Sequence, residues 1–342
     1  MLIKISNAVV VAFAALALTA CQPGDDTGPD AIAAPGLITI GSNPAGTHVY
    51  AVAAGLAKTM QERGGLRTTI RPFSGSSVYL PLLQRGELAL GLNISIDAYL
   101  AYAGLPPYDS RMGNLRLLGM MFPLPIMYMV RADSDIQKVE DLRGRNVVVT
   151  FRANAALEQL HTGILATGGL TPDDVNSVVV AGLPEAMRML TEGRADAVPT
   201  GLNTALALQV NSSVPSGIRY ITMGADEARL AEIMPGSEPV TIMPRAGLAG
   251  IERPTRVAGI VDYLNTSVAL PEDLAYTIIK TIHDSWPELR RDYTQMADTP
   301  LEAIAPANIV HPYHDGAVRF YKEAGLWTEQ HQRNQDRLLE LN

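Results

Sequence analysis

The sequence predicts an α/β fold in which two α/β lobes enclose a cleft. Three observations support this prediction. From residue 37 onward, short apolar runs alternate with longer amphipathic stretches, and the alternation occurs twice, before and after residue 115. The chain has 342 residues, of which 47% are hydrophobic, which suits about two domains with sizeable cores. Clefts between such domains, at the ends of parallel strands, are the usual place for small ligands.

Three strands, each followed by a helix, make up the first series. In the first helix, Val49, Val52 and Leu56 recur at helical spacing. The resulting βαβαβα order implies a mostly parallel sheet with helices on both faces. The expected strands are 37–40, 68–73 and 88–92, and the expected helices are 47–60, 78–84 and 94–102.

The second series repeats the pattern after residue 115. Thr171, Pro172 and Asp173 are typical of a helix start, since they supply a hydroxyl cap, a proline at the first position and an acid in the first turn. The last hundred residues are expected to be mainly helical. Strands are expected at 115–121, 127–131, 146–150, 177–180 and 195–198, and helices at 139–142, 154–167, around 185–191, from 203, at 271–285 and at 315–324.

The first 20 residues have the features of a signal peptide. They contain one basic side chain, Lys4, and an apolar run over 8–18 that is too short to span a bilayer. The run ends in Leu18-Thr19-Ala20-Cys21, which resembles the lipobox of bacterial lipoproteins. Cys21 is the only cysteine, so it cannot form an intrachain disulfide. We expect removal of 1–20 and lipidation of Cys21; the alternative is an ordinary signal peptide with a chance cysteine.

Residues 21–36 are expected to form a tether between the lipid and the folded body. The segment is rich in proline, glycine and aspartate and has little to bury. No later stretch is apolar enough to suggest a membrane span. The sequence therefore predicts a protein of the periplasm or cell surface that is held at a membrane by its N-terminal lipid.

Charge and motifs narrow the function. The formal net charge of −8 argues against nucleic acid as a partner, because binders of a phosphate backbone carry a basic patch. The sequence has no Gly-x-Ser-x-Gly, P-loop lysine or His-Glu-x-x-His motif. We therefore expect no enzymatic activity, no cofactor and no metal. His311 and His314 are expected to cap or pack a helix rather than to bind a metal.

Loops that follow parallel strands and lead into helices present free N–H groups and a partial positive charge. Thr47, Ser76 and Ser77 occupy such positions, either as ligand contacts or as simple helix caps. Arg152 directly follows a predicted strand and would hold a carboxylate by two parallel hydrogen bonds, with a surface ion pair as the alternative. Tyr50 would form a ligand wall or pack in the core.

Three segments carry a resemblance to a known family. They are 40–50, with its Gly-Ser-Asn-Pro-Ala-Gly-Thr loop, 74–91, with Ser-Gly-Ser-Ser and Gln-Arg-Gly-Glu, and 311–325, with His-Pro-Tyr-His-Asp-Gly-Ala. The stretch 141–145, Asp-Leu-Arg-Gly-Arg, is similar to one shared by many periplasmic receptors. In order and spacing they resemble the TAXI-type solute receptors of TRAP transporters, over roughly 37–325.

The resemblance implies a type II periplasmic binding protein fold, with lobe I at 37–126 plus 240–342 and lobe II at 127–239. It implies a ligand such as glutamate, 2-oxoglutarate or a related carboxylate, passed to membrane permease subunits driven by an ion gradient. The chain departs from the family at 43–45, at 93–97 and at 151–154, which are expected ligand contacts. These departures leave open a ligand other than glutamate.

The resemblance and the loop positions together give a set of candidate ligand-binding residues, in which Asn93 and Asn203 would orient a polar group of the ligand. The full set is Ser42, Asn43, Thr47, Tyr50, Ser74, Ser76, Ser77, Asn93, Phe151, Arg152, Asn154 and Asn203. The leading hypothesis is a transport receptor for a small organic anion. The alternatives are a ligand-sensing module for a membrane sensor protein and an enzyme on a similar scaffold.

Overall fold

A computed structural model describes residues 36–234 and 237–341. The predicted signal peptide (1–20), Cys21 and the tether up to residue 35 lie outside the described residues. The described strands form one ten-stranded sheet in the order β2-β1-β3-β10-β4-β7-β5-β6, with β8 added to β4 and β9 added to β10. In the described ranges, no helix has both the length and the apolar character needed to span a membrane.

Lobe I is built around three parallel strands, β1 (Ile38–Ser42), β2 (Thr68–Pro72) and β3 (Leu90–Ile94), with β1 between the other two. Each strand is followed by a helix: α1 (His48–Glu62), α2 (Ser76–Gln84) and α3 (Ser95–Ala103). These elements confirm the first predicted series. The first helix begins where predicted because Thr47 caps it, with Thr47 Oγ1 accepting from the Tyr50 N–H at 3.2 Å.

Lobe II repeats the arrangement around the parallel strands β5 (Asn146–Phe151), β6 (Asn176–Val180) and β7 (Ala197–Gly201), with β5 in the centre. Its helices are α4 (Leu157–Thr167), α5 (Leu183–Thr191), α6 (Ala205–Ser213) and α7 (Ala228–Ile233), and β8 (Ile218–Tyr220) lies at its edge. Short 3₁₀ turns occur at Val139–Leu142, Arg152–Asn154 and Pro172–Asp174. The helix start predicted at Thr171 therefore gives a single capped turn, which ends where β6 begins.

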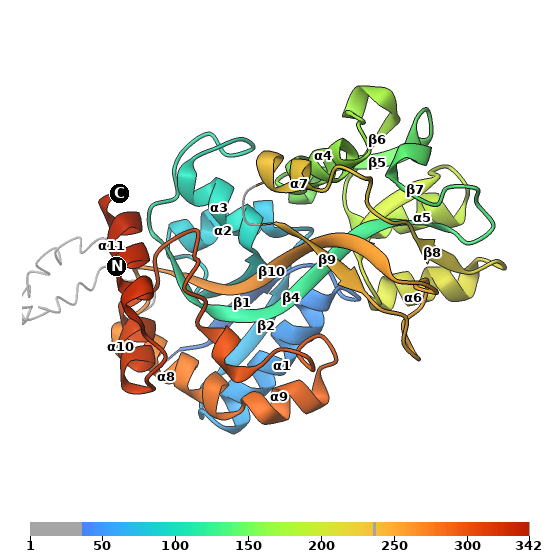
Figure 1. Cartoon of the computed structure of the whole chain (residues 1–342). Helices are drawn as coiled ribbons and strands as arrows, with labels where there is room; N and C mark the ends of the chain where they lie inside the picture. The colour runs from blue at the N-terminus through green and yellow to red at the C-terminus, as the bar shows by residue number, and fades with distance from the viewer. Residues whose placement is uncertain (1–35, 235–236, 342) are drawn as a thin grey trace, which may run out of the picture. The chain divides into compact units, whose positions relative to one another are not determined.

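Two long antiparallel strands, β4 (Leu115–Arg131) and β10 (Thr255–Ser267), connect the lobes (Figure 1). The prediction of two separate strands in 115–131 was wrong, because Pro123 and Pro125 do not interrupt β4. The Pro125 carbonyl accepts from the Leu202 N–H at 3.2 Å, so the backbone polar groups of Pro125 point away from β10. The missing N–H of Pro125 therefore removes no hydrogen bond from the ladder between β4 and β10.

The last hundred residues contain more strand than predicted. The expectation of mainly helical structure missed β10, which pairs with β9 (Glu238–Ile242), a strand just before this range. Its β-branched residues, such as Val257 and Ile260, are buried between neighbouring strands and helices. The predicted helices 271–285 and 315–324 are confirmed as α8 (Glu272–Asp284) and α10 (Asp315–Glu323), accompanied by α9 (Trp286–Asp292), a 3₁₀ turn (Leu301–Ile304) and α11 (Glu329–Glu340).

The C-terminal segment packs on lobe I. The Leu117 N–H donates to the Pro312 carbonyl at 2.8 Å, and the Tyr321 hydroxyl donates to the Leu118 carbonyl at 2.8 Å. His311 Nε2 bonds Asn265 Oδ1 at 2.8 Å, and His314 Nε2 bonds the Leu270 carbonyl at 2.9 Å. Both histidines thus serve packing in this segment, while the lobe boundaries at 126/127 and 239/240 stay a prediction.

One carboxyl group is buried in β10 without a partner. Asp262 has no exposed surface, and neither of its carboxyl oxygens has a hydrogen-bond partner among the described residues. Burial raises the pKa of Asp262 to about 8, because the low-dielectric interior disfavours the charged form. The group is therefore protonated in the folded protein at neutral pH.

Asp262→Asn should remove one loss of stability that occurs as the pH rises toward about 8. The folded protein keeps the Asp262 proton up to about pH 8, whereas the unfolded chain releases it near the ordinary value of 3.8. Folding therefore binds a proton at Asp262 between these two values, and the contribution of this group to the free energy of unfolding falls as the pH rises through them. Burial lowers the pKa of His48, His161, His311 and His314, and these groups add an opposing rise in stability around pH 6.5. The difference in free energy of unfolding between wild type and Asp262→Asn isolates Asp262, because both proteins share the histidine contribution.

Urea denaturation at several pH values measures this effect. We expect the free energy of unfolding of wild type, relative to that of Asp262→Asn, to fall between about pH 6 and about pH 8. Glu87→Gln, at an exposed position on the surface, is the matched control and should keep the wild-type slope. Equal slopes in wild type and Asp262→Asn would contradict the buried protonated carboxyl.

Candidate functional site

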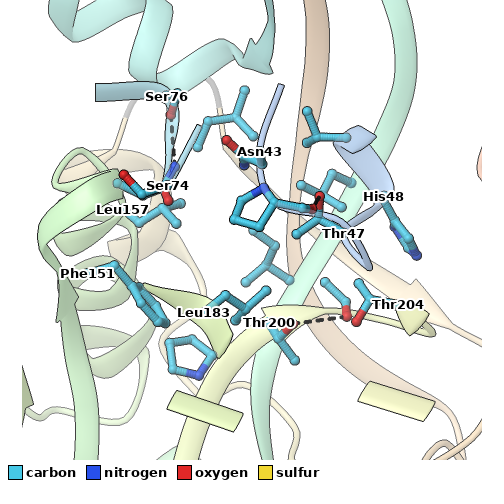
Figure 2. Close-up of a pocket in the computed structure, with 18 of the residues that line it drawn as sticks. Asn43, Thr47, His48, Ser74, Ser76, Phe151, Leu157, Leu183, Thr200 and Thr204 are labelled. Atoms are coloured by element: carbon cyan, nitrogen blue, oxygen red, sulfur yellow. Dashed lines mark hydrogen bonds between the residues drawn. The ribbon is translucent and has the colours of Figure 1, made fainter. Parts of the chain in front are cut away.

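A cavity of about 80 Å³ lies where the carboxyl ends of the parallel strands of both lobes face each other across β4 (Figure 2). On this measure a single water needs about 10–15 Å³, so the cavity has room for a compact ligand. Its lining comes from β4, from the last residues of β3, β5 and β7, and from the segments that follow β1, β2, β5, β6 and β7. The lining residues are Asn43, Pro44, Thr47, His48, Val49, Ser74, Ser76, Ile94, Leu124, Ile126, Phe151, Asn154, Leu157, His161, Leu183, Pro199, Thr200, Gly201 and Thr204.

The cavity brings together half of the candidate residues from both lobes. Figure 2 shows Asn43 and Thr47 of lobe I across the cavity from Phe151 of lobe II. This agrees with the rule that ligands of open α/β sheets bind outside the carboxyl ends of the strands. The candidates that line the cavity are Asn43, Thr47, Ser74, Ser76, Phe151 and Asn154.

Four other candidates lie near the cavity without lining it. Ser42 is fully buried, and its hydroxyl donates to the Asn43 carbonyl at 3.1 Å. Asn93 is 1% exposed, and its Oδ1 accepts from Asn265 Nδ2 at 3.0 Å, so its side chain serves the strand core. Tyr50 is half-buried on α1. Ser77 lies one residue beyond the lining and contacts lobe II instead.

Arg152 and Asn203 also lie outside the cavity lining. The Arg152 side chain is exposed, at the start of the 3₁₀ turn that follows β5. The turn directs it outward, so the expected guanidinium clamp is not part of the cavity. Asn203 adopts a positive φ of 58° and lines a second cavity.

The second cavity, of about 580 Å³, lies on the opposite face of β4. Leu124 and Ile126 line the first cavity, whereas Pro123 and Pro125 line the second, as the alternation of side chains along a strand requires. His48 lines both. The first cavity is the stronger candidate because the carboxyl ends of parallel strands from both lobes converge on it.

Sequence reasoning missed several lining residues. Thr204 caps α6 by accepting from the Ala207 N–H at 3.0 Å, and a threonine at the start of the helix expected from 203 was a usable signal. Leu124 and Ile126 were missed because they lie in the segment taken as a gap between two strands. His161 lies inside α4, where no local pattern separates a cavity-lining histidine from a core residue.

Among the residues that the structure describes, no Asp, Glu, Lys or Arg side chain lines the cavity. Burial lowers the pKa of His161 to about 4 and also lowers that of His48, so both rings are neutral at pH 7. His161 Nδ1 lies 2.6 Å from the Val149 carbonyl. A carbonyl only accepts, so Nδ1 carries the ring proton and Nε2 is an acceptor. The Oδ1 atom of Asn43 is buried and has no partner among the described residues.

Neutral hydrogen bonds join the two lobes beside the cavity. Asn154 Nδ2 donates to Ser76 Oγ at 2.9 Å, and the Ala155 N–H donates to Ser77 Oγ at 3.2 Å. The Leu206 N–H of lobe II also donates to the Gly46 carbonyl of lobe I at 3.3 Å. The described conformation is therefore closed around the cavity.

A buried carboxyl group lies beneath the hydroxyls of this contact. Asp97, on the first turn of α3, is 1% exposed and accepts a hydrogen bond from the Tyr108 hydroxyl. Burial raises the pKa of Asp97 to about 6, and the nearby hydroxyls of Ser76 and Tyr108 oppose this rise. Asp97 thus lies close to Ser76 at the start of α2, which forms one side of the contact between the lobes.

Gly75 allows the closest approach of the two lobes. A Cβ atom at this position would lie 2.0 Å from the Ala153 carbonyl oxygen and 2.4 Å from Asn154 Oδ1, far inside any real contact. Its φ of 176° is ordinary extended backbone. The need for glycine therefore comes from the neighbouring lobe and not from the turn itself.

Comparison with known proteins agrees with this architecture. The chain resembles the structure of the periplasmic binding protein BugD, with a TM-score of 0.56 and 12% identity over 89% of this chain and 96% of that one. It also resembles a structure described as a periplasmic transporter, with a TM-score of 0.52 and 12% identity over 90% and 97% of the two chains. The fold is therefore that of the two-lobed periplasmic binding proteins, as predicted.

A comparison of the sequence with models of protein families identifies the family. Residues 40–325 match the model of the NMT1-like family, and the chain belongs to that family. The match covers nearly the same range as the predicted resemblance and supports a periplasmic binding protein. The narrower assignment to TAXI-type receptors is taken up as part of the proposal below.

Gly75→Ala should weaken the closed conformation without unfolding either lobe. The added methyl group would collide with the backbone of Ala153, which cannot move aside as a flexible side chain would. The Ala155 N–H bonds Ser77 Oγ only when the lobes meet. We therefore expect the exchange of this amide with deuterium to become about tenfold faster or more in the variant.

Gly182→Ala is the matched control for this test. Its backbone is also extended, and an added Cβ would lie 3.6 Å from the Ser74 carbonyl oxygen, an ordinary contact between the lobes. It should exchange like wild type. Unchanged protection of Ala155 in Gly75→Ala would show that this contact does not limit closure.

Proposed function

We propose that this protein is an extracytoplasmic solute receptor that encloses a small organic molecule between its lobes. The observation that carries the proposal is the cavity itself. It is formed by strand ends from both lobes, and hydrogen bonds between the lobes close it. Membership of the NMT1-like family and the periplasmic binding protein fold support the same function.

The proposed partner is a membrane permease that takes the ligand from the receptor. The resemblance to TAXI-type receptors favours permease subunits of the TRAP class, driven by an ion gradient. A lipid on Cys21 would keep the receptor in the periplasm or at the cell surface, close to that partner. The residues between Cys21 and β1 would then act as the tether.

The proposed ligand is a small organic acid that carries one carboxylate. Ser74 and Ser76 line the cavity from lobe I at the start of α2, where the first N–H groups of a helix lack intrahelical partners. Asn154 and Thr200 offer polar groups from lobe II. Arg152 is left out of the proposed contacts, because its side chain is exposed.

Mass spectrometry of the natively purified protein tests the receptor function. A receptor should carry, or bind from a panel of organic acids, one ligand molecule per chain and release it chemically unchanged. Leu157→Trp would fill the cavity, because Leu157 lines it at the start of α4, and should abolish the one-to-one complex. Val179→Trp, at a 51% exposed position on β6, is the matched control.

Two outcomes would contradict this proposal. A bound molecule that Leu157→Trp retains would lie elsewhere on the protein, and the cavity would not be the ligand site. A molecule that is converted to a product during incubation would favour an enzyme instead. The melting temperature of each variant must be measured alongside, so that loss of folding is not taken for loss of binding.

Cys21→Ser tests the anchor separately from the ligand site. Without the thiol no lipid can be attached, so the protein should move from the membrane fraction to the soluble fraction after cell fractionation. Ligand binding by the released protein should be unchanged, because Cys21 lies outside the described fold. A Cys21→Ser protein that remains in the membrane fraction would contradict the anchor.

A further inference from the structure

His161 presents a hydrogen-bond acceptor to the cavity. This residue of α4 is 1% exposed and lines the cavity. Its Nδ1 donates the ring proton to the Val149 carbonyl at 2.6 Å, so Nε2 carries only a lone pair. No described residue donates to Nε2, and the protein does not enclose this atom completely. Because His161 lines the cavity, Nε2 is open to a ligand.

Two threonine hydroxyls of the lining are acceptors as well. Thr47 Oγ1, in lobe I, donates to the Pro44 carbonyl at 2.8 Å. Thr200 Oγ1, in lobe II, donates to the Gly201 carbonyl at 3.4 Å. A hydroxyl group has one proton, so each of these side chains offers a ligand only lone pairs.

A further acceptor comes from the loop after β1. Asn43 lines the cavity, and its Oδ1 is buried without a partner among the described residues. Figure 2 shows Asn43 and Thr200 on opposite sides of the cavity. Acceptors that stay unpaired in a closed cavity cost free energy, so a well-matched ligand must bring protons to both lobes.

The protons are best supplied by neutral groups. An ammonium group also donates, but its charge would need a counter-ion once it loses its hydration. No described Asp or Glu side chain lines the cavity, and Asp97 lies close to Ser76 without belonging to the lining. A hydroxyl group donates a proton without carrying a charge, and it therefore suits these acceptors.

Resting on the receptor function proposed above, we infer that the ligand is a small hydroxy acid whose hydroxyl groups donate to His161 Nε2, Thr200 Oγ1 and Asn43 Oδ1. Because these acceptors come from both lobes, the hydroxyl groups join the lobes directly and favour the closed form. None of the three acceptors belongs to α2, so they specify the hydroxyl groups whichever part of the ligand lies beside Ser76.

Isothermal titration calorimetry of the full chain with four matched probes tests this inference. They share a three-carbon skeleton: propanoate, lactate with one hydroxyl group, glycerate with two, and alanine, with an ammonium group in place of the lactate hydroxyl. We expect glycerate to bind at least about tenfold more tightly than propanoate, which leaves the acceptors unpaired, with lactate between them. Propanoate binding as tightly as glycerate, or alanine more tightly than lactate, would overturn the inference and leave the receptor function intact.

His161→Phe keeps an aromatic ring and removes Nε2. It should weaken the binding of glycerate by about tenfold or more and that of propanoate by less than about threefold. His314→Phe is the matched control and should keep the wild-type ratio of the two affinities. His314 is also buried, with Nε2 2.9 Å from the Leu270 carbonyl, but it does not line the cavity. An equal loss for both acids in His161→Phe would overturn the assignment of His161 as a ligand contact.

Thr200→Val gives a second test that leaves α4 unchanged. The substitution replaces the hydroxyl by a methyl group of similar shape, and it should lower the ratio of glycerate to propanoate affinity by about threefold or more. The wild-type ratio in this variant would overturn the assignment of Thr200 as an acceptor. If His161→Phe does not fold, the same result would overturn the inference as a whole.

The molecule that the natively purified protein carries separates the two proposals if none of the four probes binds. A carried acid with hydroxyl groups supports the inference. A carried molecule without a hydroxyl group overturns the inference, while the receptor function stands. If the protein carries no small molecule, the receptor function fails, and the ligand class fails with it.

Discussion

The pairing of β4 with β10 is the interaction on which the rest of the structure depends. These two strands run antiparallel through both lobes, from Leu115 opposite Ser267 to Ile126 opposite Ala258. The parallel strands of lobe I attach to one edge of this pair, through β3 on β10, and those of lobe II to the other, through β7 on β4. The ends of both sets of strands are thereby brought to one cavity.

The closed form is held by neutral groups placed over a buried acid. The hydroxyls of Ser76 and Ser77 accept hydrogen bonds from lobe II, and Asp97 lies beneath them. Neutral hydrogen bonds contribute only about 0.5–1.5 kcal/mol each, so contacts of this kind permit both closing and opening. Strong ion pairs across the cleft would make release of a ligand slower.

Much of the fold was predictable, and the site was predictable in part. The order of strands and helices followed from apolar runs and caps such as Thr47, because those signals are local. The continuity of β4 through Pro123 and Pro125 could not be predicted from the sequence. It depends on the backbone polar groups of Pro125 pointing away from β10, which only the tertiary structure shows. His161 and Leu183 were missed for a related reason: only the tertiary structure decides which buried side chains face a cavity. The outward position of Arg152 depends on a single 3₁₀ turn.

Gly75 shows how a residue can matter little for folding and still be required for closure of the two lobes. Its backbone angles suit any amino acid, and the nearest atoms that an added Cβ would meet belong to the other lobe. The restriction arises only when Ala153 approaches from the other lobe. Selection for stability of the chain would therefore not act on this position. Only selection for a chain whose two lobes can close would retain the glycine.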